Sequence, residues 1–251
     1  MLRRNSFLIF LALTIGILSC GGNKALLKKQ SEASRLLAEA YYVEGKITEA
    51  LQELLQAEKF YSKDPILHND FGLVYTAKIE YEKALFHFKK ALELNPQYPE
   101  AFNNMGIVYS ILKQWDKAIE CFDRARSDLL YKTPHIALSN LGSVYYEKGD
   151  YNRSVQFYKE ALKVVPQLAR ADQGLGRTYI AMGKYEEAVF SLEKAVKGAP
   201  NFAAAYYDLG QAYLKLQSFE KALSAFKKVL ELTSDGELNA KARDAIHELN
   251  R

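Results

Sequence analysis

The side chains with the strongest chemical potential in this sequence are its two cysteines, Cys20 and Cys121, and its four histidines. The histidines are spread along the chain: His68, His87, His135 and His247. None has a second ligand at the short spacing that zinc sites require. Cys121 lies between Glu120 and Phe122 with no nearby histidine to lower its thiol pKa, so it is expected to be a packed, inert thiol. Phosphate-binding loops, nucleophile elbows and acid–base pairs are absent, and the sequence predicts no enzyme, no metal and no cofactor.

Cys20 stands in a different context, at the end of a typical export signal. Arg3 and Arg4 precede an apolar run over 7–18, which is too short to cross a bilayer and suits a signal peptide. The run ends in Ile17-Leu18-Ser19-Cys20, which resembles the bacterial lipobox. That resemblance implies a signal peptide over 1–19, cleaved so that the thiol of Cys20 carries a lipid. The alternative is an ordinary secretory signal with an incidental cysteine.

The residue after the acylated cysteine bears on the expected location of the protein. Gly21 is not aspartate, and in enteric bacteria that favours transfer to the outer membrane. We therefore expect a lipid-anchored protein that faces the periplasm from the outer membrane. Residues 20–30 contain two glycines and three lysines and are expected to form a short tether.

The rest of the chain repeats with a period of 34 residues. A glycine followed three residues later by tyrosine occurs at 72/75, 106/109, 142/145, 176/179 and 210/213, and Ala38/Tyr41 has the same spacing. Twelve residues after each glycine comes a small residue, followed by a large and another small one. This spacing predicts helix pairs in which the small residues of the first helix, helix A, face the small residues of the second, helix B.

Residues expected at the ends of the helices support the same division. Gly45, Gly149 and Gly183 are expected to end helix A in a left-handed cap. Pro96, Pro166 and Pro200 are expected to stop helix B. A large residue is expected to wedge the turn of each pair, and these residues are Ile47, Tyr81, Trp115, Tyr151, Tyr185 and Phe219.

In these positions the sequence resembles the tetratricopeptide repeat. The resemblance implies an all-α fold over 31–251, a right-handed superhelix of six repeats starting near 31, 65, 99, 135, 169 and 203, with a capping helix over 237–251. Such arrays bind proteins in a concave groove lined by the A helices. Once Arg3 and Arg4 are removed, 32 basic residues face 30 acidic ones, so nothing indicates nucleic acid, and no small-molecule substrate is expected.

One interval is longer than the others, because Gly106 and Gly142 are 36 residues apart. The extra residues lie in the junction between repeats three and four, which also includes Leu129 and Leu130. Its pattern resembles that of the type IV pilus biogenesis lipoproteins, or pilotins, of the PilF and PilW family, and consists of Asp128, Tyr131, Thr133, Pro134, Ile136, Ala137 and Asn140. This resemblance implies that the partner is the pilus secretin, which pilotins help to assemble in the outer membrane. A tolerated loop insertion is the alternative.

Candidate partner-binding residues follow from the groove-lining places of repeats two and three. They combine aliphatic side chains with two amides that can bond a peptide backbone: Ile66, Asn69, Leu73, Thr76, Asn103, Ile107, Ser110 and Ile111. A more polar stretch follows in repeats five and six, at Arg170, Gln173, Arg177, Tyr207 and Gln211. Ordinary helix surface or repeat stacking is the competing interpretation for each of them. At the level of function, the alternative is a scaffold of another envelope machine, such as polysaccharide export or gliding.

Overall fold

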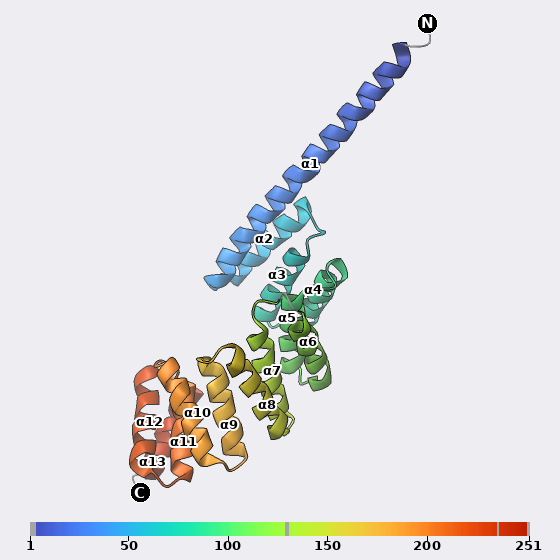
Figure 1. Ribbon diagram of the computed structural model, residues 1–251. Helices are drawn as coiled ribbons and strands as arrows, with labels where there is room; N and C mark the ends of the chain where they lie inside the picture. The colour runs from blue at the N-terminus through green and yellow to red at the C-terminus, as the bar shows by residue number, and fades with distance from the viewer. Residues whose placement is uncertain (1–3, 129–130, 235, 250–251) are drawn as a thin grey trace. The chain divides into compact units, whose positions relative to one another are not determined.

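The computed structural model describes residues 4–128, 131–234 and 236–249, with side chains from residue 23 onward. All regular structure in these residues is helical, and it forms thirteen helices (Figure 1). They are α1 (Arg4–Val43), α2 (Ile47–Phe60), α3 (Pro65–Ala77), α4 (Tyr81–Leu94), α5 (Pro99–Ile111), α6 (Trp115–Ser127), α7 (Pro134–Glu147), α8 (Tyr151–Val164), α9 (Ala169–Ala181), α10 (Tyr185–Gly198), α11 (Ala203–Lys215), α12 (Phe219–Leu232) and α13 (Glu237–Leu249). The predicted all-α repeat fold is confirmed, and α13 lies where the capping helix was expected.

The helices form two compact units, Met1–Val108 and Tyr109–Arg251, whose boundary falls within α5. In the first unit, α1 pairs with α2 and α3 with α4, around a core that includes Leu54, Phe71 and Phe88. In the second unit, α7 pairs with α8, α9 with α10 and α11 with α12. Its core contains Leu141, Leu192 and other large side chains that are almost fully buried. In both units the contacts join neighbours along the chain, as expected of repeats.

The close approach of paired helices rests on glycine in helix A. A β-carbon added to Gly72 would overlap the ring of Phe88 in α4, and one added to Gly210 would lie 2.6 Å from the ring of Phe226 in α12. Gly142 and Gly176 face Tyr158 and Leu192 in the same way. The glycine therefore makes room for the large residue of helix B, rather than for its small residues as the sequence had suggested.

The helices begin and end near the residues that the sequence predicted. Each B helix begins at its expected wedge residue, from Ile47 in α2 to Phe219 in α12, although Phe219 remains 56% exposed. Gly45, Gly149 and Gly183 adopt φ of +76°, +76° and +73°, which confirms their left-handed caps.

The equivalent turns of repeats two, three and six carry side chains in the same backbone conformation. Ile79, Lys113 and Gln217 have φ of +63°, +56° and +55°. A β-branched residue is rarely found there, because its Cβ crowds the backbone. Repeat two therefore holds its turn against a local strain at Ile79.

Helix α1 runs without a break from Arg4, through the segment expected to be a tether, into the first repeat (Figure 1). Residues 20–30 are thus helical, and side chains from Asn23 onward are mostly exposed, including Leu26 at 55%. Cys20 lies in this helix, among residues whose side chains the structure does not describe. Within the described residues, no helix combines the length and the apolar character needed to span a membrane.

Candidate protein-binding face

The face formed by the A helices, which we call the A-helix face, carries most of the candidate residues, and each unit presents its own part. In the first unit this part comes from α1, α3 and the beginning of α5, and in the second from the end of α5 and from α7, α9 and α11. Side chains at the second, fifth, ninth and twelfth places of a repeat share one side of helix A because of the 3.6-residue period.

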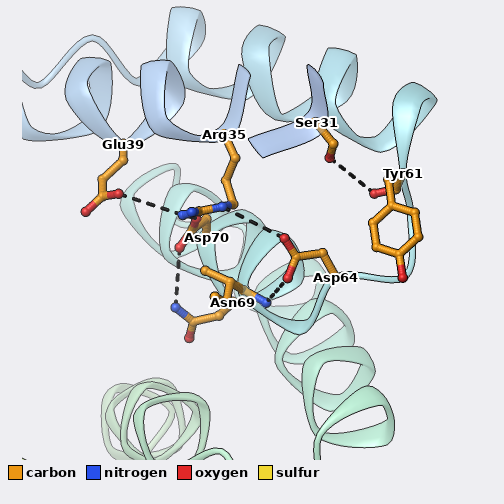
Figure 2. Close-up of polar contacts among 8 residues, drawn as sticks. Ser31, Arg35, Glu39, Tyr61, Asp64, Asn69 and Asp70 are labelled. Atoms are coloured by element: carbon orange, nitrogen blue, oxygen red, sulfur yellow. Dashed lines mark hydrogen bonds and ion pairs between the residues drawn. The ribbon is translucent and has the colours of Figure 1, made fainter. Parts of the chain in front are cut away.

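Arg35 is the central polar residue of this face in the first unit, and it is 9% exposed (Figure 2). Its Nη1 donates to Oδ2 of Asp70 in the next repeat at 3.3 Å, and also lies 3.8 Å from Oε2 of Glu39. Its Nε lies 3.9 Å from Oδ2 of Asp64, beyond hydrogen-bond distance, and has no hydrogen-bond partner. Because a buried charge is costly unless paired, the Arg35–Asp70 contact ties repeat one to repeat two.

The same connection recurs between other repeats, always 35 residues apart. Nδ2 of Asn104 donates to Oδ1 of Asn69 at 3.0 Å, and Nε2 of Gln173 donates to Oδ2 of Asp208. In each case the fifth place of one repeat meets the sixth place of the next. We call these three contacts the inter-repeat ladder: Arg35–Asp70, Asn69–Asn104 and Gln173–Asp208. A hydrogen bond of this kind contributes about 1 kcal/mol to stability and also sets the register between neighbouring repeats.

Burial alters the ionisation of the two acids in this ladder. The pKa of Asp70 is raised to about 6, because burial outweighs the opposing charge and hydrogen bond of Arg35. The pKa of Asp208 is also raised to about 6 by burial, against the hydrogen bond from Gln173 and the charge of Arg177. Both carboxyls therefore carry a desolvation penalty at neutral pH.

The candidate residues from the sequence divide into buried and accessible ones. Asn69 and Asn103 are 5% and 6% exposed, and the amide of Asn69 is engaged with Asn104 and Asp70. Repeat stacking thus accounts for the amide of Asn69, which is not displayed to a peptide. Ile66 and Ile111 are exposed at 42% and 47%. The remaining candidates are half-buried, and they are Leu73, Thr76, Ile107 and Ser110.

These candidates belong to both units. Residues from Ile66 to Ile107 lie in the first unit, whereas Ser110 and Ile111 lie in the second. The hydroxyl of Thr76 donates to the carbonyl of Gly72 at 2.7 Å, so it serves its own helix. The aliphatic members are therefore the ones that the first unit offers to a partner, and their role in binding stays a prediction.

The junction between repeats three and four lies in the second unit. The amide of Tyr131 donates to the carbonyl of Asp128 at 3.2 Å, and the Tyr131 side chain is 6% exposed. Thr133 precedes α7, Pro134 is its first residue, and Asn140 lies within it. Leu129 and Leu130 lie outside the described residues. The junction is thus anchored by a buried tyrosine and a proline at the first turn of a helix, where proline needs no amide partner.

Two histidines that looked scattered in the sequence come together in the first unit. Nδ1 of His68 lies 3.2 Å from Nδ1 of His87, and Nε2 of His68 lies 2.9 Å from the carbonyl oxygen of Ser62. A carbonyl only accepts, so Nε2 of His68 carries a hydrogen, and Nδ1 of neutral His68 accepts from His87. Burial lowers the pKa of both rings, and that of His87 falls to about 4. Sequence reasoning missed this pair because 19 residues separate its members, which lie on α3 and α4.

The remaining side chains that could carry out chemistry show no sign of a reactive or metal-binding site in the described residues. Burial raises the pKa of the Cys121 thiol to about 12, and the side chain is 5% exposed, as expected of a packed thiol. Among the described residues, no three His, Cys, Asp or Glu side chains are grouped as metal binding requires. The arrangement presents helix faces suited to contact with another macromolecule.

Comparison with curated proteins gives short matches. The chain is 35% identical over 65 residues to anaphase-promoting complex subunit 7 of Dictyostelium discoideum, which is 26% of this chain and 11% of that protein. It is 35% identical over 85 residues to photosystem I assembly protein Ycf3 of Sorghum bicolor, 32% of this chain and 47% of that protein. The chain thus spans less than half the length of these relatives.

Solved structures resemble the chain over most of its length. The crystal structure of PilW, a widely conserved type IV pilus biogenesis factor, has a TM-score of 0.77 at 21% identity, covering 88% of this chain and 98% of PilW. PilF of Pseudomonas aeruginosa has a TM-score of 0.76 at 17% identity, covering 89% and 98%. YrrB, described as a TPR protein with an unusual peptide-binding site, has a TM-score of 0.55 at 22% identity, covering 76% and 97%. At these identities the likeness establishes the fold.

Family models match nearly the whole repeat region. Two models described as tetratricopeptide repeat match residues 97–167 and 133–201, and residues 24–65 and 174–237, respectively. A third, described as TPR repeat, matches residues 72–110. Together with the observed helix pairs, these matches show that the chain is a tetratricopeptide-repeat protein.

Proposed function

We propose that this protein is a pilotin: a lipoprotein of the outer membrane that binds the type IV pilus secretin and promotes its assembly there. Cys20 carries the lipid that holds the protein at the membrane, and the repeat domain faces the periplasm and binds the secretin. Catalysis has no part in this function, because repeat arrays act by holding other proteins.

The junction between repeats three and four carries the proposal. Two extra residues in a loop cost little closure entropy, so an insertion without a role can be tolerated without any side chain being buried to compensate. Here Tyr131 is buried within the second unit and Pro134 begins α7. Two residues of the pilotin-like pattern, Tyr131 and Pro134, therefore contribute to the structure of the junction.

Structural likeness adds support. This chain aligns with 98% of PilW and 98% of PilF, so it shares their whole repeat array rather than a few common units. PilW is described as a type IV pilus biogenesis factor. The predicted export signal and the cysteine at position 20 agree with a protein that meets a secretin at the outer membrane.

The test is an immunoblot for heat-resistant secretin multimers in outer membranes from a strain that lacks this protein. We expect multimers to be lost while monomers persist, and wild-type protein supplied in trans to restore them. Normal multimers in the deletion strain would overturn the proposal. The scaffold of another envelope machine would then be the leading function, and partners captured by the intact repeat domain would identify it.

A further inference from the structure

Arg177 is an exposed arginine on the A-helix face of the second unit. It lies on α9, and its guanidinium carbon is 4.8 Å from the ring centroid of Tyr146 on α7. At this distance the guanidinium is attracted to the aromatic ring by a cation–π interaction. Arg177 is thus oriented by a side chain from the neighbouring repeat before any partner arrives.

No carboxylate of the described residues lies within 4.0 Å of the Arg177 guanidinium, and the same is true of Arg170, two turns earlier on α9. The charge of Arg177 does act on Asp208, whose pKa it lowers in part. The Asp208 carboxyl, however, accepts its hydrogen bond from Gln173. Arg170 and Arg177 therefore each place a positive charge on this part of the face without a close ion pair to a described residue.

The same unit contains an internal example of what such an arginine binds. The guanidinium carbon of Arg153 lies over Tyr145, 4.3 Å from the ring centroid, its Nη1 donates to the Tyr145 hydroxyl at 3.3 Å, and its Nε pairs with the carboxylate of Asp150. Contact with a tyrosine and carboxylate binding are therefore compatible at one guanidinium in this fold. Arg177 and Tyr146 make the same kind of arginine–tyrosine contact on the A-helix face, but without a paired carboxylate.

We propose that the Arg177–Tyr146 pair binds an acidic side chain from an extended segment of a protein partner, with Arg170 receiving a second acidic residue of that segment. A guanidinium donates two parallel hydrogen bonds to a carboxylate, and its contact with the tyrosine reduces the entropy lost on binding. Gln211 and Tyr207, which contact each other at 3.3 Å on the adjacent α11, provide polar groups for the backbone of the segment. The site is defined by its chemistry and does not require the partner to be a secretin.

The test uses the full chain and fluorescent nine-residue peptide pools, acetylated and amidated at their ends so that only side chains supply carboxylates. Two central positions are fixed as Glu or as Gln, and the other positions are random. We expect fluorescence anisotropy to show about tenfold tighter binding of the Glu pool, as for a charge-assisted hydrogen bond. We also expect the preference to weaken between low salt and about 0.3 M salt.

Variants separate this site from general attraction. Arg177→Gln is expected to remove the preference for the Glu pool, and Tyr146→Leu to reduce it while every positive charge is retained. Arg153→Gln is the matched control, because it removes the same charge from an arginine that lies over a tyrosine and is already paired with Asp150. Equal binding of both pools, or an equal loss in the Arg153 variant, would overturn the proposal. The assay contains no secretin, so its outcome is independent of the pilotin test.

Discussion

The ring of Tyr158 occupies the space in which a β-carbon on Gly142 would have to lie, since that atom would be 2.9 Å from three ring carbons. Tyr158 belongs to α8 and Gly142 to α7, so this contact brings the two helices of repeat four together. The same ring also fills the space beside Gly174 of α9. One tyrosine thus packs against glycines of two successive repeats.

Gly142→Leu is expected to lower the free energy of unfolding by about 2–3 kcal/mol, because the added side chain overpacks the crossing of α7 and α8. Denaturant unfolding followed by circular dichroism measures the change. Gly198→Ala is the control, since its β-carbon would lie 3.7 Å from that of Ala169, an ordinary contact. An unchanged midpoint for Gly142→Leu would show that the ring of Tyr158 can move aside.

Ile79→Gly is expected to raise the free energy of unfolding by about 1 kcal/mol, because glycine adopts the left-handed conformation without steric strain. Gly149→Ile, at the equivalent turn of repeat four, should lower it by a similar amount. No atom lies within 4 Å of a β-carbon built on Gly149, so backbone strain alone is tested there. Thermal melts of both variants measure the effect, and a destabilised Ile79→Gly variant would contradict it.

Asp208→Asn is expected to stabilise the protein at pH 7 by about 1–2 kcal/mol, because the wild-type carboxyl is ionised there at a desolvation penalty. With its pKa raised to about 6, Asp208 binds its proton more tightly in the folded state than in the unfolded one. Its contribution to stability therefore falls as the pH rises from about 4 to about 6. The asparagine can still accept from Gln173, and urea unfolding at pH 5 and pH 7 measures the difference.

Asp244 supplies a control for that experiment, because Asp244→Asn removes the charge of an exposed carboxylate instead of a buried one. Asp172, whose pKa is also raised to about 6 by burial, is expected to keep part of the pH dependence in the Asp208 variant. An Asp208→Asn protein no more stable than wild type at pH 7 would contradict the expected desolvation penalty.

His87 is expected to remain neutral well below pH 6.5, because burial and the neighbouring His68 lower its pKa to about 4. A depressed pKa means that the folded state binds the proton less tightly than the unfolded state. The stability contributed by His87 is therefore present above about pH 6.5 and lost as the pH falls through about 4, opposite in sign to the effect of Asp208. An NMR titration of the imidazole carbons measures it directly, and a midpoint near pH 6.5 would contradict the prediction.

Cys20→Ala is expected to release a folded, water-soluble repeat domain into the periplasm, because the observed cores of both units lie in the repeats. Fractionation followed by immunoblotting detects the change, and circular dichroism of the released protein tests its fold. Recovery of the variant in the outer-membrane fraction would exclude Cys20 as the sole anchor.

The 34-residue period determined the local structure of this protein. A wedge residue in all six repeats, a cap glycine in three of them and a proline after three B helices each act within their own repeat, so helix limits could be predicted from the period together with residue type. The period also showed which residues share one side of helix A, because that follows from 3.6 residues per turn. The capping helix and the longer junction could be located in the same way, as departures from the period.

Only the tertiary structure decided which side chains meet between repeats. Asn69 seemed available to a peptide, but the sixth place of the next repeat brings Asn104 to its amide and buries it. His68 and His87 come together because α3 and α4 cross closely. Arg177 of α9 meets the ring of Tyr146 because α7 packs beside α9. Such contacts depend on the distance and angle between packed helices, whereas the pattern of one repeat specifies only the face on which a residue lies.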